Sequence, residues 1–108
     1  MSLTNLQIRN LRAEAHRLKL KPVVMIGQHG LSESVLAELE NSINHHELIK
    51  VRIPATDKTE KKALTQSLCD QLNADEIQSI GHIVVLFRQN QKSKRPESLH
   101  LAKILGKQ

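Results

Sequence analysis

Two glycines three residues apart, Gly27 and Gly30, stand between a short apolar run and a segment typical of a helix start. At the beginning of a helix, the first four backbone N–H groups have no partner inside the helix, and the helix dipole is positive there. Glycines allow a tight turn and let a phosphate approach without a side chain in the way. Gly27, Gln28, His29 and Gly30 are therefore a candidate phosphate site, although this spacing also occurs in ordinary turns.

Known phosphate-binding motifs restrict the interpretation of this loop. A P-loop needs a longer spacing between its glycines and a following Lys-Ser/Thr, and both are absent. The dinucleotide fingerprint needs a third glycine at its own spacing, which is also absent. The remaining match is the G-x-x-G loop of KH-type modules, which clamps the backbone of single-stranded nucleic acid.

The charge balance suits a polyanionic partner. The chain has 108 residues, with 16 Lys and Arg against 11 Asp and Glu, so its formal net charge is +5. Phe87 is the only aromatic residue, so the protein has no platform of rings on which to stack bases. If the chain binds RNA, it does so through backbone amides, basic side chains and shape.

Other residues with chemical potential form weaker patterns. His45 and His46 precede Glu47, but neighbouring residues in a connection do not converge on one ion without further ligands. Nothing in the sequence fixes a base beside Cys69. His29 is the best candidate for the general base of a ribonuclease, yet it would need a second acid/base group and a charge stabiliser. We expect no metal, no cofactor and no catalytic residues.

The predicted elements place the glycine loop between a strand and a helix. Val23–Ile26 is a continuous apolar run, typical of a strand buried on both faces. A strand–helix–strand unit pairs its strands in parallel, and a closing hairpin adds an antiparallel pair. We therefore predict a single α/β domain in the order α-β-α-β-α-β-β, with a four-stranded mixed sheet packed by helices. The expected elements are helix 4–19, strand 23–26, helix 32–44, strand 48–53, helix 57–73 and strands 77–80 and 83–88.

Basic side chains accompany these elements. Four of them recur at helical spacing and form a mainly basic face on the first helix: Arg9, Arg12, His16 and Lys19. Lys50 and Arg52 alternate with core residues, so they share one face of their strand. Such side chains either line an RNA surface or are simply solvated, and the sequence leaves both open. The groups expected to flank the loop are Arg9, Arg12, Lys19 and Lys21 before it, and Lys50, Arg52 and Arg88 after it.

The chain changes character after residue 90. We predict an RNA-binding domain over residues 1–90 and a basic, flexible tail over 91–108, in which Leu99, Leu101, Ile104 and Leu105 could form a short final helix. A single cysteine is typical of a reducing compartment. The sequence has neither an apolar run of about 18 residues nor the apolar segment of a signal peptide. A cytoplasmic location without membrane attachment is therefore expected.

Several blocks of the sequence together resemble a known family, the bacterial YhbY-like RNA-binding proteins of the chloroplast RNA splicing and ribosome maturation (CRM) group. The resemblance covers roughly residues 4–90. The blocks are Leu11 through Ala15-His16, Leu20–Val24, Ile26–Leu31, His45–Val51, Ile80-Gly81-His82 and Leu86-Phe87-Arg88.

The resemblance implies an α/β fold similar to the C-terminal domain of bacterial translation initiation factor three. It also implies RNA binding and association with precursors of the large ribosomal subunit. Carried onto this sequence, the RNA-contacting loop is Gly27, Gln28, His29 and Gly30. Many members of the wider group have Lys or Arg between the glycines, whereas Gln28 and His29 are uncharged at neutral pH. The backbone amides of the loop would then make the contact.

These observations predict a non-catalytic, monomeric RNA-binding protein that attaches to ribosomal RNA during maturation of the large subunit. The alternative is a protein-interaction module that docks on ribosomal proteins or assembly factors without touching RNA.

Overall fold

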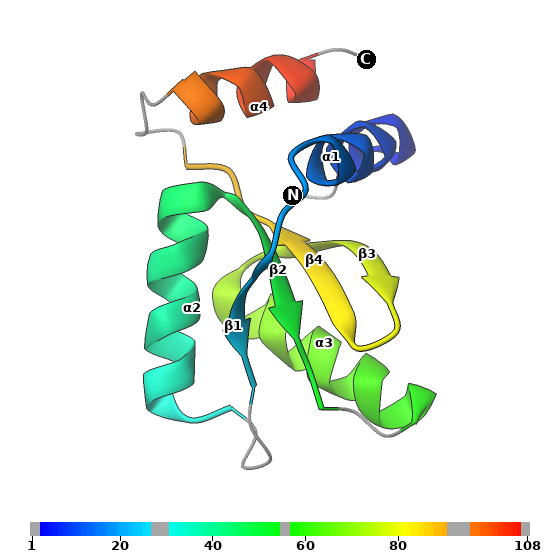
Figure 1. Cartoon of the computed structure of the whole chain (residues 1–108), viewed down its shortest axis with the longest axis vertical. Coiled ribbons are helices and arrows are strands. Elements are labelled where there is room, and N and C mark those ends of the chain that lie inside the picture. Colours follow the sequence, from blue (N-terminus) through cyan, green and yellow to red (C-terminus); the bar gives the residue numbers. More distant parts are fainter. Residues whose placement is uncertain (1–2, 27–30, 55–56, 91–95, 107–108) are drawn as a thin grey trace.

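The element order follows the prediction and adds one helix at its end (Figure 1). The computed structural model describes residues 3–26, 31–54, 57–90 and 96–106. The predicted glycine loop, residues 27–30, thus lies outside the described residues. The elements are α1 (Asn5–Arg17), β1 (Pro22–Met25), α2 (Glu33–His46), β2 (Leu48–Arg52), α3 (Lys58–Leu72), β3 (Asp75–Ile80), β4 (Ile83–Phe87) and α4 (Pro96–Gly106).

The four strands form one mixed sheet in the order β1-β2-β4-β3. β1 runs parallel to β2, while β4 is antiparallel to both β2 and β3. Gly81 has a φ of +56°, a backbone conformation that favours glycine, and it lies in the tight turn that joins Ile80 to Ile83. The predicted mixed α/β sheet is confirmed.

Side-chain caps mark where α2 and α3 begin, and a left-handed residue marks where α3 ends. The Ser32 hydroxyl accepts a hydrogen bond from the Val35 amide at 3.2 Å and caps α2. Asp57 accepts from the Glu60 amide at 2.7 Å and caps α3. Asn73, in the left-handed conformation, ends α3 where the sequence placed its end.

Helix α2 is longer than predicted. His45 and His46 form its last turn instead of a polar connection. The helix ends at Glu47, which has a φ of 66° and whose amide donates to the Ile43 carbonyl at 2.8 Å. The end was missed because neither glycine nor proline marks it.

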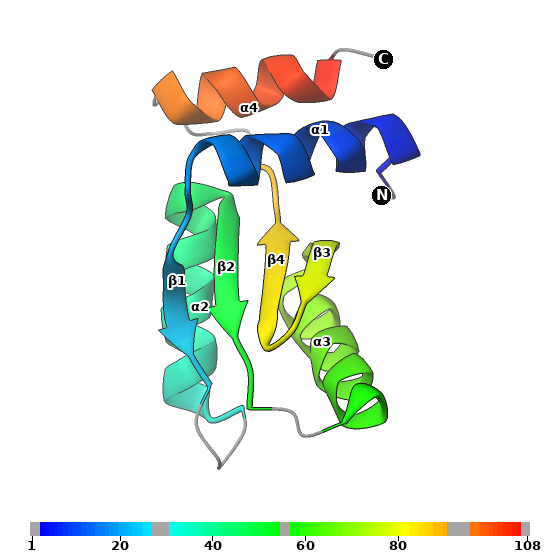
Figure 2. The same cartoon turned by 45° about the vertical axis from the view of Figure 1, so that its right-hand side comes forward.

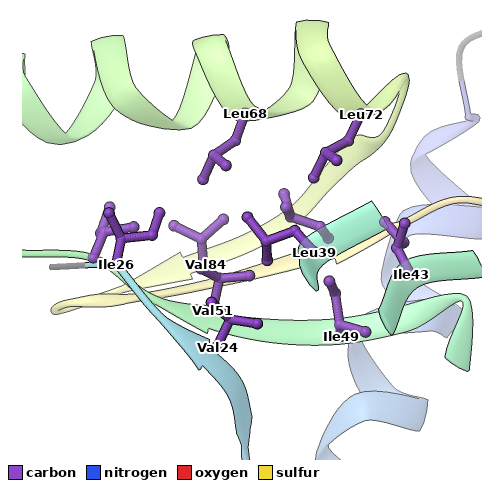
Figure 3. Packing of buried hydrophobic residues seen from close by; sticks show 11 residues of the cluster. Val24, Ile26, Leu39, Ile43, Ile49, Val51, Leu68, Leu72 and Val84 are labelled. Carbon is purple, nitrogen blue, oxygen red and sulfur yellow. The ribbon is translucent and has the colours of Figure 1, made fainter. Parts of the chain in front are cut away.

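Two apolar clusters lie on opposite faces of the sheet. One is packed beneath α2 and α3, where Leu39 and Leu68 meet Ile49 and Val51 of β2 (Figure 3). The other joins α1 and α4 to the sheet and includes Leu48, the residue next to Ile49 in β2. Because side chains alternate along a strand, β2 contributes to both clusters.

Strand β1 is not buried on both faces as predicted. Val24 is buried, but the Met25 side chain is 68% exposed. β1 is an edge strand, and α1 crosses only one end of the sheet on the Met25 side (Figure 2). An apolar run alone does not distinguish an edge strand from a central one.

Residues 96–106 of the predicted tail form α4, which packs alongside α1 (Figure 2). Leu101 is buried in one cluster with Leu11 of α1. The Gln7 side-chain amide also donates to the Leu105 carbonyl at 3.0 Å. The short final helix considered from the sequence is thus present, because its apolar side covers exposed surface of α1. The domain boundary after residue 90 stays a prediction.

A buried carboxylate connects α4 to α1. The Glu14 side chain is only 3% exposed, and it accepts hydrogen bonds from the Arg17 guanidinium. The His100 ring lies 2.8 Å from the same carboxylate. The pKa of the Glu14 carboxyl falls below the ordinary 4.5, because Arg17 and His100 stabilise its charged form more than burial opposes it.

We predict that Glu14→Gln lowers the free energy of unfolding at pH 7 by about 1–2 kcal/mol, because bonds to a charged acceptor are lost. A lowered carboxyl pKa stabilises the fold above the unfolded value near 4.5, and this contribution disappears as pH falls through the folded pKa. The difference between wild type and variant should therefore shrink between pH 7 and about pH 3. Urea unfolding curves measure it.

Glu38→Gln is the matched control, because Glu38 is exposed on α2. A constant difference between wild type and Glu14→Gln across this pH range would contradict the account of Glu14.

Candidate nucleic-acid interface

The end of β1 and the start of α2 have the arrangement that the glycine-loop prediction requires. The Ile26 amide donates to the Arg52 carbonyl at 2.9 Å, so the chain leaves β1 beside the end of β2. It returns at Ser32, the cap of α2. Both points lie at the end of the sheet opposite α1 (Figure 2). Residues 27–30 connect them and are not among the described residues.

The start of α2 carries two opposing electrostatic effects. Its first amides have no acceptor inside the helix, and the helix dipole attracts anions there. Ser32 satisfies the Val35 amide. Glu33 in the first turn stabilises the helix, but it also places a negative charge close to any bound phosphate. Attraction at this end therefore depends on a nearby cation as well as on backbone amides.

Arg52 is the predicted cation that lies beside the end of β1, with its side chain on the sheet face opposite α2. Its side chain is exposed, and its backbone pairs with the Ile26 amide just before the loop. Within the sheet, Arg52 lies opposite Met25 of β1 and Ile83 of β4. Lys50, two residues earlier, is half-buried and lies on the same face of β2. That these two cations share one face is confirmed.

The open part of this sheet face is partly apolar, which sequence reasoning missed. Met25 and Ile80 are 68% and 62% exposed, and Ile80 pairs with Ile83 in the hairpin. Directly opposed residues lie on the same face of a sheet, so these apolar groups flank Arg52. The alternation of each strand contained this signal, but only the strand order brings the residues into one row.

The basic residues that precede the loop in the sequence lie on α1 and between α1 and β1, away from the start of α2 (Figure 2). Arg9, Arg12 and His16 are exposed on α1, and Lys19 and Lys21 are exposed where α1 leads into β1. α1 and the start of α2 are at opposite ends of the molecule (Figures 1 and 2). The structure therefore does not bring the α1 cations beside the predicted loop; they form a separate basic surface.

Arg88 is engaged in an intramolecular contact. Its guanidinium donates to the Glu40 carboxylate at 2.9 Å and to the Leu72 carbonyl at 2.8 Å. The ion pair lowers the pKa of Glu40 and raises that of Arg88. These contacts join β4 to α2 and α3, so Arg88 has a structural role that the sequence did not reveal.

The described residues also bear on other chemistry. Within residues 3–26, 31–54, 57–90 and 96–106, no three His, Cys, Asp or Glu side chains gather where they could hold a metal ion. None of the described helices is long and apolar enough to cross a membrane.

Burial and the nearby carboxylates of Glu76, Asp75 and Asp70 raise the pKa of Cys69 to about 11. Its thiol is therefore protonated at neutral pH and is a poor nucleophile.

Known proteins are similar to this chain in sequence. The model of the CRS1/YhbY (CRM) domain matches residues 3–88. An RNA-binding protein of Haemophilus influenzae is 43% identical over 86% of this chain and 92% of its own length. A probable RNA-binding protein of Pseudomonas aeruginosa is 40% identical over 88% of this chain and 89% of its own length.

A solved structure gives the same class of fold. The solution structure of a hypothetical RNA-binding protein of Staphylococcus aureus is similar, with a TM-score of 0.71 and 30% identity. The structural match covers 88% of this chain and 94% of the Staphylococcus aureus chain. The molecule is thus an α/β domain with a four-stranded mixed sheet. The chain belongs to the CRS1/YhbY (CRM) domain family.

We predict that Cys69 reacts slowly with iodoacetamide in the folded protein. A pKa of about 11, against about 8.5 for a free thiol, lowers the thiolate fraction at pH 7.5 by about two orders of magnitude. Mass spectrometry follows the modification. Unfolding in urea should restore the rate of a free thiol. Equal rates in the folded and unfolded protein would show that the Cys69 thiol is ordinary.

Proposed function

We propose that this chain is a non-catalytic RNA-binding protein that attaches to ribosomal RNA in precursors of the large ribosomal subunit and assists their maturation. One observation carries the proposal: a CRM family chain leaves β1 beside Arg52 and re-enters at the capped start of α2. Two relatives, from Haemophilus and Pseudomonas, are named as RNA-binding and probable RNA-binding proteins, which supports RNA as the ligand.

In this proposal, backbone amides of residues 27–30 and of the first turn of α2 hold RNA phosphates. Arg52 adds a positive charge at the same end of the sheet, on the face opposite α2. Lys50 continues the contact along β2 on the same face. The α1 cations act as a second electrostatic surface at the other end, which attracts RNA but does not touch the loop. Arg88 stabilises the fold.

The chemistry of the described residues supports binding over catalysis. The Cys69 thiol is protonated at neutral pH. Arg88, a charge that could otherwise stabilise a transition state, is held by Glu40 and the Leu72 carbonyl. A ribonuclease needs a positioned base, an acid and a charge stabiliser acting together.

We predict that Gly27→Asp with Gly30→Asp weakens binding to single-stranded RNA by more than about tenfold, because two carboxylates would face the phosphates. The circular dichroism spectrum and the free energy of unfolding should stay close to wild type, because the caps of α2 and α3 are untouched. Fluorescence anisotropy with labelled RNA measures affinity. Wild-type affinity in a folded double variant would reject the loop as the binding site.

The same titrations in different salt concentrations test Arg52. Each phosphate neutralised on single-stranded RNA contributes about −0.7 to the slope of log K against log salt, so five contacts give about −3.5. Arg52→Ala should make the slope shallower by about 0.7. Lys62→Ala on α3 removes an exposed cation beneath the other sheet face and is the matched control. Equal slopes for the two variants would exclude Arg52 from the interface.

A second candidate function is docking on a ribosomal or assembly protein without RNA contact. The observation that favours it is the pair of exposed apolar side chains, Met25 and Ile80, on the open sheet face. This face could bury apolar groups of a protein partner as well as meet RNA.

Sedimentation of cell extracts separates the two functions. We expect the chain to migrate with large-subunit precursors and to leave them after RNase treatment or in high salt, because phosphate contacts are salt-sensitive. Crosslinking with sequencing of bound RNA should then identify large-subunit ribosomal RNA. Association that survives both treatments would support the protein-docking function and contradict the RNA proposal.

A further inference from the structure

A pocket lies where α1, α4 and the start of β2 meet. Its volume is about 600 Å³, within the range of small-molecule sites. The apolar part of its lining is formed by Leu18 and Leu20 after α1, Leu48 and Ile49 of β2, and Leu101 of α4. We call it the α1–α4 pocket. α1, α4 and the start of β2, which line it, lie at the end of the sheet opposite the start of α2 (Figure 2).

Positive and titratable groups surround this apolar lining. Arg17, Lys21 and Lys50 line the pocket together with His46 and His100, and none of the described residues that line it is Asp or Glu. Glu14 lies behind this wall, 3% exposed, where it fixes the Arg17 guanidinium and the His100 ring. Lys21 and Lys50 therefore supply the positive charge at the pocket, which favours an anionic occupant.

The pocket continues the surface proposed to bind RNA. Lys50 lines the α1–α4 pocket and also a smaller hollow of about 170 Å³ with Gln78, Ile80 and Ile83. That hollow lies on the open sheet face, where Ile83 is opposite Arg52. An RNA strand that runs along β2 from Arg52 to Lys50 would therefore reach the pocket.

We propose that the α1–α4 pocket takes one unpaired nucleotide of the bound RNA. The base of this nucleotide lies against the leucine-rich lining, and Lys21 and Lys50 hold the adjoining backbone phosphates. This chain has a single aromatic residue, Phe87, and it is buried, so an apolar pocket replaces the ring on which other proteins stack a base. The inference rests on the proposed RNA-binding function and adds a second contact to it.

Helix α4 supplies part of the pocket from outside the matched CRM domain. Pro96, His100 and Leu101 line the pocket, and all three lie beyond residues 3–88, which match the CRM domain. The other lining residues, from Arg17 to Lys50, belong to the matched domain.

The test is an NMR titration of the full chain, with labelled leucine and isoleucine methyl groups, using adenosine monophosphate, adenosine and inorganic phosphate as probes. We expect the two adenosine probes to shift the methyl signals of Leu18, Leu20 and Leu101, and inorganic phosphate to leave them in place. Adenosine monophosphate should bind more tightly than adenosine, because only the former carries a phosphate.

Two variants locate the binding. Leu18 is 43% exposed, so Leu18→Glu places a carboxylate at the pocket with little loss of packing, and affinity for adenosine monophosphate should fall about fivefold. Ala63→Glu, on an exposed site of α3, makes the same change in side-chain charge far from the pocket and should leave affinity unchanged. Lys21→Gln should weaken binding of adenosine monophosphate and leave adenosine unaffected.

Some outcomes would overturn the inference. These are no methyl shift with either adenosine probe, the same shifts with inorganic phosphate, or equal effects of Leu18→Glu and Ala63→Glu. Shifts with an acidic, leucine-containing peptide but not with adenosine monophosphate would assign the pocket to a protein partner instead.

The Gly27→Asp, Gly30→Asp variant separates this inference from the proposed function. It should lose affinity for long RNA and keep the methyl shifts with adenosine monophosphate. If wild type fails to bind long RNA but shows those shifts, the proposed function fails while nucleotide binding at the pocket stands.

Discussion

The period-two alternation of β2 is the constraint on which both the fold and the candidate interface depend. Ile49 and Val51 point into the core beneath α2 and α3, while Lys50 and Arg52 point to the other face. A slip of one residue in register would carry both cations into the core, where an unpaired charge is very costly. The parallel pairing with β1 and the antiparallel pairing with β4 prevent that slip from both sides. The register that buries the core is therefore also the one that exposes the cations.

The separation of the basic surfaces would limit how the protein binds the proposed RNA ligand. The molecule is 38 Å long, with α1 at one end and the start of α2 at the other (Figure 1). At physiological ionic strength, exposed charges are screened over about 8 Å. The α1 cations therefore cannot reinforce a phosphate held near Ser32. A ligand must be long enough to touch both ends, or it uses them as independent sites, and β2 with Lys50 and Arg52 is the path between them.

Local features of the chain were predictable from sequence because local chemistry determines them. Ser32 and Asp57 cap helices where their side chains predict caps, and alternation placed Lys50 and Arg52 on one face. Features that depend on strand order or distant partners were not predictable. Met25 is exposed because β1 is an edge strand, and nothing local to Arg88 shows that it pairs with Glu40, far away in the chain.

Parts of the candidate site were likewise predictable from the sequence, and other parts were not. The strand before residues 27–30 and the helix after them were predictable, since each has its own sequence pattern, whereas the contacts of the loop itself stay a prediction. The position of the α1 cations was not predictable, because helical periodicity says which residues share a face but not where the helix packs. The same limit hid the α1–α4 pocket, whose lining comes from α1, α2, β2 and α4, which only the tertiary fold brings together.

Glu14 explains how α4, which lies beyond the end of the family match, stays packed against the rest of the domain. A buried carboxylate is stable only when hydrogen-bond donors surround it. Arg17 comes from the same helix and remains largely exposed, whereas His100 comes from α4. Leu101, the next residue, enters the apolar cluster that contains Leu11. One turn of α4 therefore supplies a polar partner for Glu14 and an apolar contact with α1, and both hold α4 as the outer wall of the pocket.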